Sequence, residues 1–383
     1  MKSYRLGDLA EIIMGQSPEG QFYNTLGEGK PLITGSGQFG ARYPEPSQFS
    51  KVGVRTSHPG DLLMCIRATI GDLNWSDREY FLGRGVAAIR PTTQVNPEYL
   101  WHYLSTQKSY LESRANGSTF KQIKRDDVSD LEIPLPSLPE QMRIAAILDA
   151  AEALREKRRE AIGKLVRLRA SLFDHLFGKP ENNSKGWKIT SMGALISDGP
   201  QNGLYKPSTD YGTGVPILRI DGFYDGVVTG QSTLKRVRVS EKEASLYSLT
   251  ADDIVINRVN SLPFLGKSAL VPALEEPTLF ESNVMRLTVD RKIVDPVYLV
   301  QFLQTGYIKN QIRSCAKEAV NQASINQTDV KNFVVALPPL SLQQEFGMQA
   351  RALEKLQMTQ ESSSAHLDSL FTSLQHRAFR GEL

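Results

Sequence analysis

The chain contains an internal repeat of about 200 residues, and this repeat limits its possible folds more than any other feature. Residues 123–177 align with residues 325–379 without a gap, at a shift of 202 positions. A second block, residues 96–106, aligns with residues 295–305 at a shift of 199. Solenoid repeats are about 20–50 residues long, so a period of this size corresponds to a whole domain with a connector. The length of 383 residues agrees with two such domains.

The two halves differ in the segments that lie between the aligned blocks. Each variable segment has short strand-like runs punctuated by glycines, a pattern typical of an α/β domain of the α+β type. A repeated frame with two different inserts predicts a molecule that makes the same kind of contact twice, with two different targets. The expected organisation is a domain at residues 1–130, a connector with a long helix at 131–180, a second domain at 187–333, and a second connector with a long helix at 334–383.

A long amphipathic helix is predicted after each domain. From Glu140 to Gly178, apolar residues recur at steps of three and four over about four heptads, and a helix of this length measures about 57 Å. A shorter stripe would indicate a helix packed on its own domain, but equal seams in both halves favour an antiparallel coiled coil of two helices. In that pair the equivalent residues Arg158 and Gln360 would meet in one polar layer that fixes the register. The predicted seam consists of Ile144, Ile147, Ala151, Leu154, Arg158, Ala161, Leu165, Leu168 and Leu172, with Phe346, Leu353, Leu356, Gln360, Leu367, Leu370 and Leu374.

Composition excludes several classes of protein. The net charge of +3 and the pI near 8.6 are compatible with nucleic-acid binding. Two cysteines, Cys65 and Cys315, cannot form a disulfide scaffold, so a reducing cytoplasm is the expected compartment. No apolar run reaches 18 residues, and the first ten residues lack the apolar core of a signal peptide, so neither membrane insertion nor secretion is expected.

The sequence predicts no catalytic site and no metal site in this chain. Gly266-Lys267-Ser268 resembles the end of a phosphate-binding loop. However, Ser261 stands where that loop needs a glycine, and Pro272 follows where it needs a helix. The five histidines show no metal-ligand spacing, and we find neither a dinucleotide fingerprint nor a nucleophile elbow.

Polar side chains that could read DNA are frequent in the variable segments. Arginine suits the major-groove edge of guanine, and asparagine or glutamine suits adenine. Lysines and backbone amides in loops such as residues 116–121 suit phosphates. For any single residue a solvated surface charge is the simpler interpretation, and the set is better supported than its members. The candidates are Gln38, Arg42, Arg67, Arg84, Lys121 and Lys124 in the first half, and Tyr205, Lys206, Arg219, Asn257, Arg258, Asn260 and Lys267 in the second.

The whole chain resembles the specificity subunit of a type I restriction–modification system. The resemblance is carried by the alternation of variable and repeated segments, by the connectors IPLPSLPEQMRI from Ile133 and LPPLSLQQEF from Leu337, and by the ending HRAFRGEL. The chain departs from the pattern at Leu342, where the first repeat has Glu140. The resemblance implies two target-recognition domains that each read one half of a split, asymmetric DNA site. It also implies that the helix pair spaces these domains and binds two modification (methyltransferase) subunits.

The resemblance implies that this chain itself holds no cofactor. S-adenosylmethionine for adenine methylation belongs to the modification subunits, and ATP and Mg belong to two restriction subunits where these join the complex. Two other functions remain open from the residues alone. A self-contained Mg/ATP-dependent nuclease using the Gly266 region would be active as an isolated chain. A coiled-coil assembly scaffold without DNA contact would show no sequence-selective binding, and the two divergent glycine-rich domains argue against it.

Overall fold

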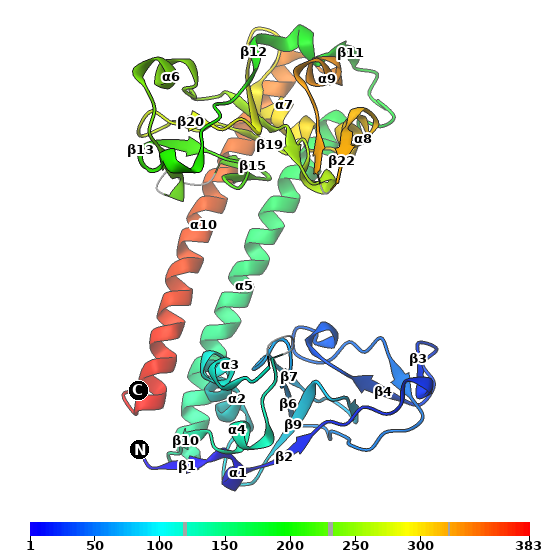
Figure 1. The fold of residues 1–383 in the computed structure, drawn as a ribbon, viewed down its shortest axis with the longest axis vertical. Helices are drawn as coiled ribbons and strands as arrows, with labels where there is room; N and C mark the ends of the chain where they lie inside the picture. Colours follow the sequence, from blue (N-terminus) through cyan, green and yellow to red (C-terminus); the bar gives the residue numbers. More distant parts are fainter. Residues whose placement is uncertain (118–120, 229–232, 321) are drawn as a thin grey trace. The chain divides into compact units, whose positions relative to one another are not determined.

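The computed structural model describes residues 1–117, 121–228, 233–320 and 322–383. It divides into two compact units. The first unit comprises Met1–Glu160 with Ser362–Leu383, and the second comprises Ala161–Glu361. Each unit therefore combines a domain of mixed helices and strands with parts of both long helices (Figure 1). The predicted α+β class is confirmed.

The first unit contains two four-stranded sheets beside a small group of helices. The strand orders are β2-β9-β6-β7 and β3-β5-β4-β8. β6 lies inside the first sheet and all four of its side chains are buried, as expected for a central strand made of Leu62, Leu63, Met64 and Cys65. The elements in chain order are β1 (Ser3–Arg5), α1 (Leu6–Leu9), β2 (Ala10–Met14), η1 (Gly20–Phe22), β3 (Tyr23–Asn24), β4 (Lys30–Ile33), η2 (Ser36–Gln38), β5 (Phe49–Ser50), β6 (Leu62–Cys65), β7 (Leu73–Trp75), β8 (Phe81–Leu82), β9 (Val86–Pro91), α2 (Pro97–Thr106), α3 (Lys108–Arg114), α4 (Arg125–Ser129), β10 (Glu132–Pro134) and α5 (Leu138–Phe177).

The second unit repeats this frame with different insertions. Its largest sheet has the order β12-β21-β17-β19-β15-β14, whose first four strands correspond to β2-β9-β6-β7. The elements are β11 (Lys188–Ser191), η3 (Met192–Leu195), β12 (Ile196–Asn202), η4 (Ser208–Asp210), β13 (Tyr211–Leu218), β14 (Phe223–Tyr224), β15 (Gly226–Val228), β16 (Lys235–Val237), α6 (Glu241–Leu246), β17 (Ile254–Asn257), β18 (Val259–Asn260), η6 (Leu262–Phe264), β19 (Ser268–Leu270), β20 (Leu279–Phe280), β21 (Val284–Val289), α7 (Pro296–Leu303), α8 (Gly306–Cys315), β22 (Lys317–Ala319), β23 (Gln322–Ser324), α9 (Gln327–Asn332), β24 (Val334–Leu337) and α10 (Leu340–Arg380).

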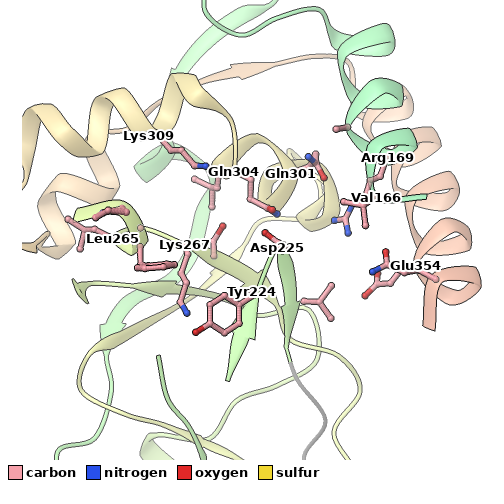
Figure 2. A pocket seen from close by; sticks show the side chains of 18 of the residues that line it. Val166, Arg169, Tyr224, Asp225, Leu265, Lys267, Gln301, Gln304, Lys309 and Glu354 are labelled. Carbon is pink, nitrogen blue, oxygen red and sulfur yellow. The ribbon is translucent and has the colours of Figure 1, made fainter. Parts of the chain in front are cut away.

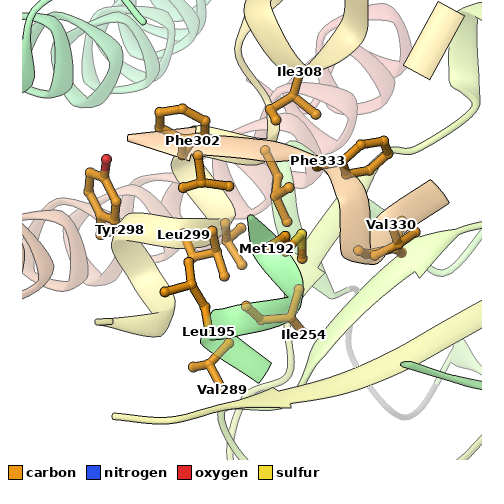
Figure 3. Packing of buried hydrophobic residues seen from close by; sticks show 14 of the residues in the cluster. Met192, Leu195, Ile254, Val289, Tyr298, Leu299, Phe302, Ile308, Val330 and Phe333 are labelled. Carbon is orange, nitrogen blue, oxygen red and sulfur yellow. The ribbon is translucent and has the colours of Figure 1, made fainter. Parts of the chain in front are cut away.

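The core of the second unit lies between its sheet, its short helices and the two long helices. Figure 3 shows Leu299 of α7 beside Met192 and Leu195 of η3, and all three side chains are buried in one cluster. α7 begins where the sequence places a capping residue before a proline. The Asp295 carboxylate accepts hydrogen bonds from the amides of Val297 and Tyr298, and Pro296 needs no donor at the first helical position. Asn96 and Pro97 start α2 in the same way.

A buried glutamine ties each long helix to the domain before it. Gln343, at the start of α10, is fully buried; its side-chain oxygen accepts from the Asp295 amide (2.9 Å) and its Nε2 donates to the Pro338 carbonyl (2.7 Å). Gln141 of α5 makes the equivalent bonds to Asn96 (2.7 Å) and Pro136 (3.0 Å). These glutamines are aligned in the repeat, and the structure gives them the same role.

We expect Gln343→Ala to lower the free energy of unfolding of the second unit by about 1–3 kcal/mol, because it leaves a buried amide and a buried carbonyl unpaired. Gln344→Ala is the matched control, because the neighbouring side chain is exposed and its loss should change stability by less than about 0.5 kcal/mol. Urea denaturation of the two variants measures the difference. Equal stabilities of the two variants would show that the buried bonds of Gln343 contribute nothing.

The two long helices pair in opposite directions within each unit. In the first unit Arg155, in the first half of α5, bonds to Asp368 in the second half of α10 (2.6 Å). In the second unit Phe173 and Phe177, at the end of α5, pack on Phe346 at the start of α10, with ring centroids 5.5 Å apart in both pairs. The predicted antiparallel arrangement is therefore confirmed. Arg158 belongs to the first unit and Gln360 to the second, so their shared polar layer stays a prediction.

The helix seam differs from the predicted one at four positions. Most predicted seam residues are partly or fully buried, including Ile144, Ile147, Ala151, Ala161, Leu165, Leu172, Phe346, Leu353, Leu367 and Leu374. The side chains of Leu154, Leu168, Leu356 and Leu370 are instead about half exposed, with 57%, 52%, 46% and 55% of their surface open to solvent. In α5 the partly buried Arg155 and Arg169 lie beside them in sequence and occupy the inward positions. Across the residues that the structure describes, no helix is long and apolar enough to cross a membrane.

Candidate nucleic-acid interface

Three exposed basic residues of the first unit come together where β6 ends. Arg67 is the second residue after β6, Arg84 lies just before β9, and Lys121 lies in the loop before α4. The Ile66 amide donates to the Gly85 carbonyl (2.9 Å), and the Ala68 amide donates to the Lys121 carbonyl (3.3 Å). These bonds bring three segments that are distant in sequence to one end of the sheet. Of the predicted phosphate-binding loop at residues 116–121, residues 118–120 lie outside the described residues.

The other candidates of the first unit have different surroundings. Gln38 is 8% exposed, and its side chain accepts from the Thr34 amide (2.7 Å) and donates to the Leu32 carbonyl (3.0 Å). It therefore supports its own loop, and a base contact would require it to leave these bonds. Arg42 is half exposed, pairs with Glu98 (2.8 Å), and lies over the Trp75 ring (5.4 Å). Lys124 is exposed at the start of α4.

In the second unit Arg258 occupies the place equivalent to Ile66. Its amide donates to the Asn283 carbonyl (2.9 Å), as Ile66 does to Gly85. Arg67 and Arg258 end similar eight-residue segments, but the strand register places them one residue apart. The Arg258 Nη1 donates to the Ser282 carbonyl (3.1 Å), and the residue is partly exposed. The next strand, β18, contains the partly exposed Asn260 and pairs with β23.

The remaining candidates of the second unit are not all free to contact DNA. Asn257 is fully buried at the end of β17, so its side chain does not reach solvent. Tyr205 is 76% exposed. Lys206 pairs with Glu243 (2.8 Å) and, with the capping Ser240, lowers the pKa of that carboxyl to about 2. Arg219 lies 3.4 Å from a Glu281 carboxylate oxygen, and the Lys267 ammonium lies 3.6 Å from the centre of the Tyr224 ring.

The structure adds one residue that the sequence did not single out. Lys317 is exposed on β22, which pairs with β23, and β23 pairs with β18 beside Arg258. A lysine in a short irregular segment carries no signal of its own. Only the strand pairing places it near the end of β17.

The Gly266 segment is not a phosphate-binding loop. Ser268 begins the strand β19, whereas that loop must be followed by a helix. Gly266 has a backbone φ of +74°, and a Cβ there would lie 2.1 Å from Ile312 Cδ1, so local geometry accounts for the glycine. The nuclease interpretation therefore has no support. Among the described residues, no group of three or more histidine, cysteine, aspartate or glutamate side chains could hold a metal ion.

Both repeats expose the same leucines on the long helices. Leu154 and Leu370 belong to the first unit, and their repeat equivalents Leu356 and Leu168 belong to the second. All four are about half exposed. The same pair of leucine positions is therefore exposed in two otherwise different units.

Comparison with known proteins identifies one family. Residues 1–164 match the type I restriction modification DNA specificity domain. The StySPI specificity subunit of Salmonella potsdam is 28% identical over 324 residues, which cover 80% of this chain and 69% of that protein. The putative MjaX specificity subunit of Methanocaldococcus jannaschii is 37% identical over 151 residues, 39% of this chain and 36% of that protein.

The fold agrees with a solved structure over the full length of the chain. The S subunit of a type I restriction–modification system from M. genitalium superposes with a TM-score of 0.58 at 16% identity, covering 99% of this chain and 96% of that one. At this identity the likeness supports the fold alone, and the sequence matches support the family. Residues 1–164 therefore match the DNA specificity domain of type I restriction–modification systems, and most of the chain is similar in sequence to specificity subunits of these systems.

Proposed function

We propose that each unit reads one part of a split DNA site through the segments at the end of its central strand. The observation that carries this proposal is the convergence at β6 and β17: the same framework strand in each unit leads into segments of different sequence. In the first unit these segments carry Arg67, Arg84 and Lys121. In the second they carry Arg258, Asn260 and Lys317. Arginine and asparagine suit base edges, and lysine suits phosphates.

The helix pair is proposed to space the two units and to bind two modification subunits, one on each unit. The repeated exposed leucines support binding of two copies of one partner, because the same partner surface would meet equivalent residues twice. S-adenosylmethionine is proposed to bind to these partners, and ATP and Mg to restriction subunits where they join. The complex is proposed to act in the cytoplasm, where it reaches the cell's DNA.

The proposed function is tested by co-expressing the chain with the methyltransferase encoded beside it. We expect native mass spectrometry to show one specificity subunit with two modification subunits. Sequencing of modified bases should show methylated adenines in one split sequence, and the chain expressed alone should methylate nothing. A purified complex that methylates adenines without sequence preference would contradict DNA recognition by this chain. A complex with a single modification subunit would contradict docking on both repeats.

A further inference from the structure

The second unit contains a cavity of about 660 Å³. Arg169 of α5 and Glu354 of α10 line one side, and Tyr224 of β14 and Lys267, just before β19, lie opposite (Figure 2). Gln301, on α7, completes the wall. All of these residues belong to the second unit. The cavity has the size of a typical ligand-binding pocket.

The repeat shows what fills this place in the first unit. Phe371, the equivalent of Arg169, is buried, and the Arg155 guanidinium lies 4.3 Å from its ring centre. Asp368 accepts a hydrogen bond from Arg155 (2.6 Å) and Glu152 accepts another, so the cluster contains an aromatic ring, a cation and two carboxylates. At the position equivalent to Asp368 the second unit has Val166. The second unit therefore has a cation at this place and keeps Glu354, the equivalent of Glu152, but lacks the equivalent of Asp368.

The Arg169 guanidinium is not matched by a direct ion pair within the part of the chain that the structure describes. Its Nε is buried without a hydrogen-bond partner. Burial lowers the pKa of Arg169, and the charge of Glu354 offsets this effect in part. The Ser268 hydroxyl, which lines the same cavity, is also buried without a partner.

The rim of the cavity favours a protein partner over a nucleic acid. The carboxylates of Asp225, Glu354 and Glu361 line it together with the cations of Arg169, Lys267 and Lys309, so the cavity lacks the uniformly basic surface that favours a phosphate backbone. Val166 and Met358, which also line it, are 47% and 61% exposed, and apolar rim residues are typical of protein interfaces. The Arg169 Nε is buried without a direct partner, and a carboxylate in fork geometry would offset its desolvation.

We propose that this cavity receives an acidic side chain of the modification subunit, whose carboxylate pairs with Arg169. The inference rests on the proposed function, in which that subunit binds the long helices. It predicts that the two copies of the partner are held differently. The copy on the second unit inserts a carboxylate at Arg169, whereas the copy on the first unit meets Phe371 and Arg155, which are already packed together.

The test compares Arg169→Gln with Arg167→Gln, a matched loss of charge at an exposed position two residues away. Both variants are titrated as full chains with the purified modification subunit. Arg169→Gln removes a charge-assisted hydrogen bond from a desolvated site. We therefore expect its affinity for the modification subunit to fall about 10- to 100-fold at one of the two sites. Arg167→Gln should stay within about 2-fold. Arg169→Lys keeps the positive charge but cannot form two parallel hydrogen bonds to a carboxylate, so its affinity should lie between those of the other two variants.

The outcomes separate the possible roles of Arg169. Equal binding of wild type and Arg169→Gln would overturn the inference, and a lowered melting temperature with unchanged binding would show a purely structural role. Loss of DNA affinity with normal partner binding would show a phosphate contact instead. Failure of the wild-type chain to bind the subunit would overturn the proposed function itself. A neutral Asn or Gln in place of the partner's acidic residue should weaken binding to wild type but not further weaken binding to Arg169→Gln.

Discussion

Replacing Phe177 with alanine is expected to lower the free energy of unfolding of the second unit by about 3–5 kcal/mol. Phe177 is the last residue of α5 and is 4% exposed. Its ring lies edge-on to Tyr298 (4.7 Å between centroids), 5.0 Å from Phe173 and 5.5 Å from Phe346. The substitution removes the side chain where α5, α7 and α10 meet, and the rigid helices cannot close the cavity that remains.

The control for this prediction is Leu168→Ala on the same helix. Leu168 is 52% exposed, so its loss should change stability by less than about 1 kcal/mol. Hydrogen exchange of backbone amides in α7 measures the stability of the second unit directly. If Phe177→Ala and Leu168→Ala destabilise that unit equally, the aromatic cluster does not hold the end of α5 in the way the structure indicates.

The repeat in the sequence was enough to predict the architecture. The gapless alignment from Ile123 and Ile325 indicated two copies of one frame, and the structure places Gln141 and Gln343 in the same bonds in both. The long helices were predictable because a stripe without proline persists over four heptads. Such patterns depend on local periodicity, which the sequence displays directly.

The direction in which each residue of the long helices faces was harder to predict from the sequence than the helices themselves. Apolar residues spaced by three and four positions are compatible with two neighbouring stripes along the helix surface. Hydrophobicity alone favours the stripe that contains leucine over the adjacent one that contains arginine. The structure instead turns Arg155 inward, because its guanidinium stacks on Phe371 and its charge is paired with Asp368. Leu154 is left outward at the adjacent position. Neither ring stacking nor a charge pair between distant segments is visible in a periodicity.

The candidate DNA contacts depended on strand register, which the sequence does not specify. Side chains alternate between the two faces of a strand, so an error of one residue exchanges buried and exposed positions. Asn257 appeared available next to Arg258, but it is the last residue of β17 and is fully buried. Lys317 carried no signal until the pairing of β22, β23 and β18 placed it near Arg258.

Exchange of the first domain is expected to change half of the recognised sequence completely. The exchange replaces residues 1–130 with the corresponding domain of another specificity subunit and keeps the connectors and both helices. The retained Gln141 accepts a hydrogen bond from the amide of Asn96, the first residue of the repeated block, so a related domain should dock without loss of stability. The exchange removes Arg67, Arg84 and Lys121 together, and with them the proposed contacts of one unit.

Sequencing of methylated adenines in cells that express this chimera with the modification subunit tests the central claim most directly. The account predicts that one part of the split site changes to that of the donor while the other part and the length of the spacer stay the same. An active complex in which both parts change, or in which neither changes, would contradict independent reading by two units.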